Sequence, residues 1–577
     1  MPSRKRPSLL ERLALETIGS IFKSSCHRSA QYLLSMAEMQ EFDHPHLGLE
    51  VDPQINRVVR QLQVAFLDEV PQKFHQFILR ECLVALSDLF RATSLLHHEA
   101  SLHIQGSDPE SRRRRLMREE LQLAFVKFFC HRTAIREINL TPEFLGYRPL
   151  HWCIVARLCS LIWNMESLVT LRLGGWNCLQ YGLLSRHNQS EGWQLKCMPN
   201  LTRIQVSSVG EKFFEVIGTF CPNLKELKVQ SSSITDLVTF WVSKCSQLEC
   251  IELFDNFAVT PIGFAQLLRA LANLRSLGRC DVIGEAFTLL YADKSIFRRS
   301  IGSACPELLS LEEIDCEAKI SPEALSFIIN HCKNLKSLRF KFLPTDEVNL
   351  LSAEPYGTLS MLNTLNLLSE LNLSACDFYG HHLFQVLQQR GKFLQKLELN
   401  DVDEMNWNSI ELIGNQVPNL KFLSLRCCHF QSLPNLDSVQ VQMTTSSHLA
   451  TDWRPFQALR GLDIVIFTPM HFVVVKGIVQ FASLLKSFIF NLLSDDLEED
   501  HVRHIMKWNS FTNLEEFEVT AGSRLSIHIV NFIIERCPNL NRLGRLRNWG
   551  RLQKHEIEAI QKEISSRNFN LKFDNDF

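Results

Sequence analysis

A short apolar pattern recurs along most of the chain, and it constrains the fold more than any other feature. The pattern is one apolar residue, two variable residues, a second apolar residue, one variable residue and a third apolar residue. Clear copies begin at Leu168, Leu201, Leu224, Leu248, Leu335, Leu368, Leu394, Leu420, Leu459, Leu485 and Leu514, and weaker copies at Ile135, Leu274, Leu308 and Leu540. From Leu168 onward the starts lie 23 to 39 residues apart, and 26 is the commonest interval. Such a period indicates one supersecondary unit that is stacked many times.

Each copy predicts a short strand, and the residues between copies predict a helix. The last two apolar residues are two apart, so they point to the same side of a strand. Helical spacing follows in Asp236 to Lys244 (Leu237, Phe240, Trp241), Pro322 to Asn330 (Ala324, Leu325, Ile328, Ile329) and His528 to Glu535 (Ile529, Phe532, Ile533). One strand and one helix cannot enclose a core, but stacked units can, with a parallel sheet inside and helices outside.

The residues just before several strands share one junction. It occurs at Cys221 to Leu224, Cys305 to Leu308 and Cys537 to Leu540, and in variant form after Cys245 and Cys332. In this junction the chain resembles the cysteine-containing, ribonuclease-inhibitor-like leucine-rich repeats of F-box/leucine-rich-repeat ubiquitin-ligase receptors. The resemblance implies an α/β solenoid, a leucine-rich-repeat horseshoe with a parallel inner sheet and outer helices. It also implies a substrate receptor that contains no catalytic site.

Three segments follow from the extent of the repeats. Residues 1–130 lack the pattern and form a helical segment, 131–553 form an array of about fourteen or fifteen units, and 554–577 form a closing helix and tail. Helices are predicted over Leu9–Ser24, Ser29–Phe42, Asn56–Phe66, Pro71–Leu95, Arg118–Phe129 and Lys554–Ser565. The Ser-, Thr- and Gln-rich stretch Gln431–Asp452 is predicted to be a projecting loop.

The first helix resembles the opening of an F-box, whose apolar residues dock on a Skp-type adaptor. Ala14 stands where that family has proline, and no later tryptophan completes the motif. The resemblance predicts that the following residues bind an adaptor: Leu13, Leu15, Ile18, Ile21 and Phe22.

Two other interpretations of the N-terminal segment stay open. Ser8, Leu9 and Leu13 resemble an elongin-binding box. The residues Val70-Pro71 with Phe74, Phe77 and Ile78 resemble the proline-centred cullin box that follows it. Both the F-box alignment and the elongin-box alignment imply the same role, an amphipathic helix that docks the chain on a cullin scaffold. The remaining interpretation is a helical cap that closes the first repeat, which every open array needs.

The variable positions between the buried strand residues form the predicted concave, substrate-facing surface. They are Arg203, Gln205, Glu226, Lys228, Arg339, Lys341, Asn372, Lys396, Glu398, Ser424, Arg426, Asp463, Glu516 and Glu518. A ladder of mixed charges suits a protein or peptide with its own charge pattern better than a polyanion.

Composition narrows the class of partner. With 61 Lys and Arg against 63 Asp and Glu, the chain has no global field for nucleic acid or an anionic membrane. The most hydrophobic stretch, His471 to Leu493, contains two lysines, so we expect repeat strands and helices there rather than a membrane span. The absence of a signal-peptide pattern predicts a cytoplasmic or nuclear chain with reduced cysteines.

No enzyme motif accompanies the repeats. The sequence contains no Walker loop, no GxGxxG helix opening and no C-x-x-C pair. Eighteen cysteines occur, several of them at one repeat position, where small buried residues are expected. We therefore predict a non-enzymatic protein with no catalytic, metal-binding or cofactor-binding site.

Overall fold

The computed structural model describes two compact units, Met1–Arg279 and Cys280–Phe577. The described residues are 17, 19–21, 23, 24, 27, 28, 31, 64, 75–84, 86, 135–140, 162, 165–173, 198–207, 211–230, 234–254, 258–292, 307–342, 359–431, 455–467, 471–493, 497–519, 524–546, 549, 551–566 and 571–573.

The first unit alternates strands and helices. Its strands are β1 (Glu137–Leu140), β2 (Thr170–Leu173), β3 (Arg203–Ser207), β4 (Glu226–Gln230), β5 (Cys250–Phe254) and β6 (Ser276–Arg279). Its helices are α8 (Glu211–Phe220), α9 (Asp236–Val242) and α10 (Pro261–Ala270). Each strand pairs in parallel with the next in chain order, so that equivalent residues of successive repeats stand side by side.

The second unit repeats the same arrangement. Its strands are β7 (Glu313–Ile320), β8 (Ser337–Phe342), β9 (Glu370–Asp377), β10 (Lys396–Asp403), β11 (Phe422–Arg426), β12 (Gly461–Ile466), β13 (Ser487–Leu492), β14 (Glu516–Val519), β15 (Arg542–Gly544) and β16 (Lys572–Phe573). Its helices are α11 (Ile283–Tyr291), α13 (Pro322–His331), η5 (Leu359–Thr364), α14 (Leu383–Arg390), η6 (Gly391–Phe393), α15 (Trp407–Gln416), α17 (Phe472–Val479), α18 (Glu499–Lys507), α19 (Ile527–Arg536) and α20 (Lys554–Ser566). Pairing is again parallel and in chain order.

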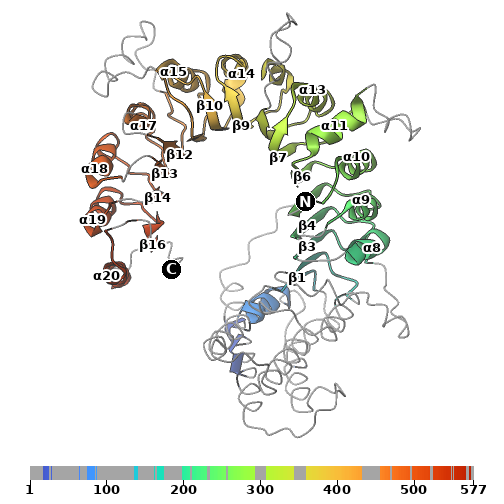
Figure 1. The fold of residues 1–577 in the computed structure, drawn as a ribbon. Coiled ribbons are helices and arrows are strands. Elements are labelled where there is room, and N and C mark those ends of the chain that lie inside the picture. Colours follow the sequence, from blue (N-terminus) through green and yellow to red (C-terminus); the bar gives the residue numbers. More distant parts are fainter. Residues whose placement is uncertain are drawn as a thin grey trace, which may run out of the picture. The chain divides into compact units, whose positions relative to one another are not determined.

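Within each unit the strands line one face and the helices the opposite face (Figure 1). The three apolar residues of every clear sequence copy lie between these layers, and each exposes at most 3% of its surface. The fold is therefore the leucine-rich-repeat solenoid that the pattern predicts.

The elements predicted at three places are confirmed, but one of the helices buries a different face from the expected one. Helix α13 begins after Ser321, whose side chain accepts a hydrogen bond from the Ala324 amide, and it buries the four predicted apolar residues. The stretch from His471 to Leu493 forms the buried helix α17 and strand β13, as expected. In α9, however, Leu237 and Phe240 are 49% and 50% exposed. The buried face of that helix is instead Val238, Thr239 and Val242.

The repeat before β7 starts three residues later than predicted. Leu308 is 62% exposed, whereas Leu311, Ile314 and Cys316 are buried. Leu311 therefore takes the first apolar position of that repeat.

A ladder of asparagine side chains joins successive repeats at the turn before the strand. In six repeats the residue just before the first apolar position donates its amide to a backbone carbonyl of the preceding repeat. The pairs are Asn200 to Glu166, Asn223 to Pro199, Asn273 to Ser246, Asn419 to Lys392, Asn513 to Ser483 and Asn539 to Thr512, at 2.7 to 3.4 Å. Each accepting residue lies two positions before the first apolar residue of its own repeat, so the ladder fixes how one turn sits on the next.

Among the described residues of the N-terminal segment, Gln76 bonds to the edge of the first strand. The described residues of that segment are helical, and they include most of 75–86. From this helix the Gln76 amide donates to the Glu137 carbonyl at 2.8 Å, and its Oε1 accepts from the amides of Arg136 and Glu137 at 3.1 and 3.0 Å. Because these are the bonds that a neighbouring strand would make to β1, the helix does cap the first repeat.

Replacing Gln76 by Met should expose the edge of β1. Loss of the acceptor should speed hydrogen exchange at the amides of Arg136 and Glu137 about fivefold, because a net hydrogen bond contributes about 1 kcal/mol. Hydrogen exchange of peptides over 134–140, compared with peptides over β10, measures the change. Gln76→Glu is the matched control, since it keeps the acceptor and should protect both amides. Equal exchange in the wild type and Gln76→Met would show that the helix does not seal this edge.

Candidate protein-binding face

On each strand the residues that flank the buried pair point away from the core, and together they form the strand face. On β11, for example, Phe422, Ser424 and Arg426 occupy the first, middle and third row of this face, while Leu423 and Leu425 are buried. All fourteen predicted substrate-facing residues occupy such positions. Contact with a ligand remains a prediction for each of them.

In the first unit, opposite charges alternate between neighbouring strands. Arg203 on β3 pairs with Glu226 on β4 at 3.3 Å, and Lys228 on β4 pairs with Glu252 on β5 at 2.6 Å. The hydrogen bond that Lys228 donates to Glu252 raises the pKa of Lys228, so this ammonium group stays charged. Gln205 lies exposed in the middle row of β3.

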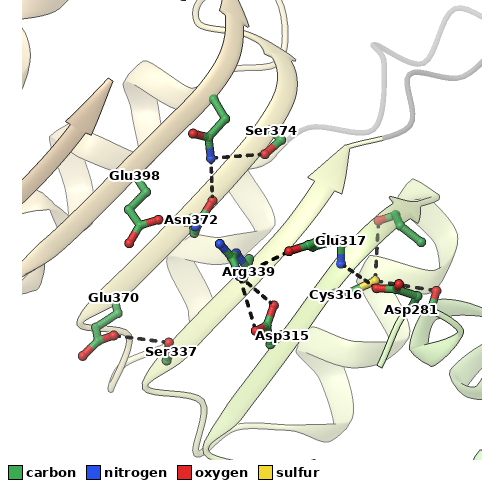
Figure 2. A network of polar contacts seen from close by, with 12 residues as sticks. Asp281, Asp315, Cys316, Glu317, Ser337, Arg339, Glu370, Asn372, Ser374 and Glu398 are labelled. Atoms are coloured by element: carbon green, nitrogen blue, oxygen red, sulfur yellow. Dashed lines mark hydrogen bonds and ion pairs between the residues drawn. The ribbon is translucent and has the colours of Figure 1, made fainter. Parts of the chain in front are cut away.

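In the second unit, Arg339 of β8 is held by acids of β7. Its guanidinium lies 3.4 Å from Asp315 and 3.7 Å from Glu317 (Figure 2). On the other side of β8, Ser337 donates to Glu370 of β9 at 3.4 Å. Lys341 lies half-buried in the third row of the same strand.

A buried polar cluster continues onto β9 and β10. Asn372 donates to Glu398 and accepts from Asn400 at 3.1 Å, while Lys396 pairs with Glu398 at 2.6 Å. These bonds satisfy side chains that the sheet has partly removed from water, so this part of the face is rigid.

The most buried charge of the face is Asp463 on β12, at 3% exposure. It accepts from Arg426 of β11, with Nε at 2.8 Å and a second guanidinium nitrogen also bonded. The hydrogen bond to Asp463 raises the pKa of Arg426 further. A bond between charged groups contributes about 2 kcal/mol, and removing the arginine would leave a buried carboxylate unpaired.

Acids also define the far end of the described face. On β14, Glu516 accepts from Ser487 at 2.8 Å and from Arg542, and Glu518 pairs with Arg545 at 2.7 Å. Glu518 is buried, as are Asn372, Ser424 and Asp463. These four side chains therefore offer a ligand little surface, and their contact with a ligand stays a prediction.

An apolar spot interrupts the polar ladder, and the sequence analysis did not include it. Phe422 lies over Gly461 of β12, where a Cβ atom would come within 2.6 Å of the ring. Lys396 Nζ lies 5.4 Å from the centroid of the same ring. In the rows beyond, Val465 and Ile489 are half-buried on β12 and β13. The repeat pattern in the sequence would have been enough to find these residues. They occupy the same variable strand positions as the residues that were predicted to face the substrate.

The spot and the Arg426–Asp463 pair together form the candidate site. An aromatic ring, aliphatic side chains and an oriented guanidinium on a rigid sheet are the groups that dominate binding energy at protein interfaces. The arrangement can bind a protein segment that places an apolar side chain against Phe422 and a hydrogen-bond acceptor near the guanidinium of Arg426.

Of the five predicted adaptor-binding residues, only Ile21 is described. It is 59% exposed. Two residues earlier, Gly19 is buried, and a Cβ there would lie 2.8 Å from the Phe77 ring, so the helix packs through that side. Leu13, Leu15, Ile18 and Phe22 lie outside the described residues, as does nearly all of the predicted loop Gln431–Asp452.

The recurring cysteines are packing residues. Cys221, Cys245, Cys332 and Cys537 each lie three positions before the first apolar residue of a repeat, and all four are buried. Burial raises the pKa of Cys245 to about 11 and that of Cys537 to about 12. Cys305 lies outside the described residues.

The adjacent pair Cys427 and Cys428 allows a direct test of this burial. Burial raises the pKa of Cys428 to about 12, while Cys427 is only half-buried. A raised pKa lowers the thiolate fraction, so iodoacetamide at pH 8 should modify Cys427 at least about a hundredfold faster. Fragment-ion mass spectrometry of the shared peptide measures both rates, which should converge in denaturant. Similar rates in the folded protein would contradict the burial of Cys428.

Within the described residues, no group of three or more His, Cys, Asp or Glu side chains is arranged to hold a metal ion. None of the helices in that part of the chain is long and apolar enough to cross a bilayer.

Comparisons with known proteins identify no family for this chain. No protein-family model matches the chain, and no curated protein matches it. Among solved structures, a chain of the yeast Rad7–Elc1 complex matches with a TM-score of 0.34 and 13% identity, over 62% of this chain and 78% of that one. A chain of the TLR13–ssRNA13 complex matches with a TM-score of 0.30 and 14% identity, over 75% and 68%. Likenesses this distant carry no argument about function, but the repeat geometry itself defines a leucine-rich-repeat protein.

Proposed function

We propose that the chain is a non-catalytic receptor whose strand face binds a protein substrate and whose N-terminal helices dock on a cullin-RING ubiquitin ligase. The observation that carries the receptor role is the apolar spot at Phe422 beside the Arg426–Asp463 pair. The Phe422 ring is half-buried on the strand face against Gly461 of the next strand, and its remaining exposed surface is available to a partner.

Ile21 supports the ligase half of the proposal. The helix that carries it packs through Gly19, so an exposed apolar side chain remains for an adaptor. The buried cysteines at one repeat position support the resemblance to the cysteine-containing repeats of F-box receptors. The adaptor is a Skp-type protein if the F-box alignment holds and elongin if the other alignment holds.

The cap formed by Gln76 favours the alternative, a leucine-rich-repeat scaffold with no ligase coupling. Capping β1 is by itself enough to explain why the chain has a helical N-terminal segment, so no adaptor contact is needed to account for it. The two roles are compatible, because the residues that seal the sheet and the exposed Ile21 lie on different helices.

Binding to purified adaptors separates the two possibilities. The full chain should bind either a Skp-type adaptor or elongin, and Ile21→Asp should weaken that binding at least tenfold by placing a charge in an apolar contact. Val64→Asp is the matched control, because Val64 is an exposed apolar side chain, at 58%, on another helical segment. Biolayer interferometry measures both. If neither adaptor binds the wild type, or if both variants bind equally, the scaffold alternative holds.

Photo-cross-linking tests the strand face. A photoreactive phenylalanine analogue at position 422 should capture proteins whose ubiquitination depends on this chain, and Arg426→Glu should reduce that capture at least tenfold. The same analogue at position 240, a 50% exposed phenylalanine on the helix face of the first unit, is the control. Mass spectrometry identifies the captured proteins. Identical sets from both positions would remove the strand face as the binding site.

A further inference from the structure

The turn that carries the asparagine ladder is apolar in one part of the second unit. Six repeats place a hydrogen-bonding asparagine there. In the repeats of β9, β10 and β13 the same position holds Leu367, Phe393 and Leu484, which are 50%, 45% and 46% exposed.

At these three positions the asparagine hydrogen bond is absent, and the apolar side chain is not buried in its place. Leucine and phenylalanine cannot donate to the carbonyl of the preceding repeat, and about half of each side chain stays in water. Single exposed apolar side chains are ordinary. Three at one structural position within five successive strands form a band, and such bands on soluble proteins mark interaction sites.

Cations surround this band. Lys392 Nζ lies 5.0 Å from the centroid of the Phe393 ring, and Arg390, bonded to the Asn363 carbonyl at 2.7 Å, lies 5.7 Å from it. Lys421 and Arg460 are exposed at the starts of the next two repeat strands.

These cations lack acidic partners in the part of the chain that the structure describes. No ion pair links Lys392, Lys421 or Arg460 to a described carboxylate, and the Lys421 ammonium donates to the Gln395 side chain at 2.8 Å. By contrast, Lys486 at the equivalent position of β13 pairs with Glu515. Three cations are thus available to a ligand.

We propose that this turn rim, defined as Leu367, Phe393, Leu484, Lys392, Lys421 and Arg460, binds an acidic segment of a partner protein that carries apolar anchor side chains. Parallel strands lie about 4.8 Å apart, so Phe393 and Leu484, three strands from each other, are about 15 Å apart. An extended segment of about five residues covers that distance. Lys421 and Arg460 of the rim directly precede Phe422 and Gly461 of the strand-face site, but the rim proposal does not depend on the proposed function.

A protein segment fits the rim better than a membrane or nucleic acid. In strand order the rim has apolar side chains at its two ends and cations beside and between them, which matches a chain with both acidic and apolar residues. A continuous anionic surface would also meet Glu515 and Glu370, which lie at the neighbouring strand starts.

The test selects peptides from a random twelve-residue display library on the immobilised full chain. The counter-selection uses Leu367→Asn/Phe393→Asn, which introduces at both positions the residue that holds the turn in six other repeats. This variant should melt no lower than the wild type. Leu237→Asn, an equally exposed apolar site on α9, is the matched control.

Peptides that prefer the wild type over the double-asparagine variant should combine Asp or Glu with Phe or Leu. By fluorescence anisotropy a synthetic representative should bind the wild type and Leu237→Asn equally. It should bind the double-asparagine variant and Lys392→Glu/Arg460→Glu at least tenfold more weakly. Ile21→Asp should bind it like the wild type, which separates this site from the proposed adaptor contact.

Three results would overturn the proposal. They are the absence of any peptide that prefers the wild type, a preferring pool without acidic residues, and phosphatidylserine vesicles that bind more tightly than the peptide and lose binding in the same variants. If the double-asparagine variant melts early, the charge-reversal variant, whose two changes are at exposed positions, decides the outcome alone.

Discussion

The structure depends on one constraint, which is that no repeat can bury its own apolar residues. A strand with two inward side chains and a short helix leaves half of its core surface open, and only the next repeat closes it. Parallel pairing in constant register satisfies this need, because Leu371, Leu397 and Leu423 then stand side by side in three strands. The asparagine ladder acts at the same junction from outside the core, holding each turn against the one before it.

The same register explains the electrostatics of the strand face. Side chains at one position of neighbouring strands stand within reach of each other, so charges that are 23 to 37 residues apart in sequence become ion pairs. The near-zero net charge of the chain is therefore a property of local pairs such as Arg203 with Glu226 and Arg426 with Asp463. A partner has to match the charge of each side chain that it contacts, because the face has no uniform electrostatic potential of one sign.

Sequence reasoning predicted the fold because the buried triplets repeat, and each triplet is a local pattern. It mistook the buried face of α9 because both sides of that helix are apolar, and spacing alone cannot tell which side meets the sheet. It misplaced the start of the β7 repeat because Leu308 and Leu311 are three apart and either can begin the pattern.

The site was harder to predict than the fold. The burial of Asp463 depends on Arg426 and on the neighbouring strands, which are distant in sequence, so no local pattern shows it. Phe422 was missed for another reason: charged residues were sought on the face, although the register points equally to every variable position.

The contact between Gln76 and β1 has a consequence for the behaviour of the protein at high concentration. An open edge of a parallel sheet offers unpaired amides and carbonyls to any extended chain, and it is a common starting point for edge-to-edge association. The carboxamide of Gln76 carries one acceptor and one donor in the spacing that a strand presents. They bond to the amides of Arg136 and Glu137 and to the carbonyl of Glu137. Gln76 thus occupies, at the start of β1, the backbone groups that an added strand would need first, and this should disfavour edge-to-edge association there.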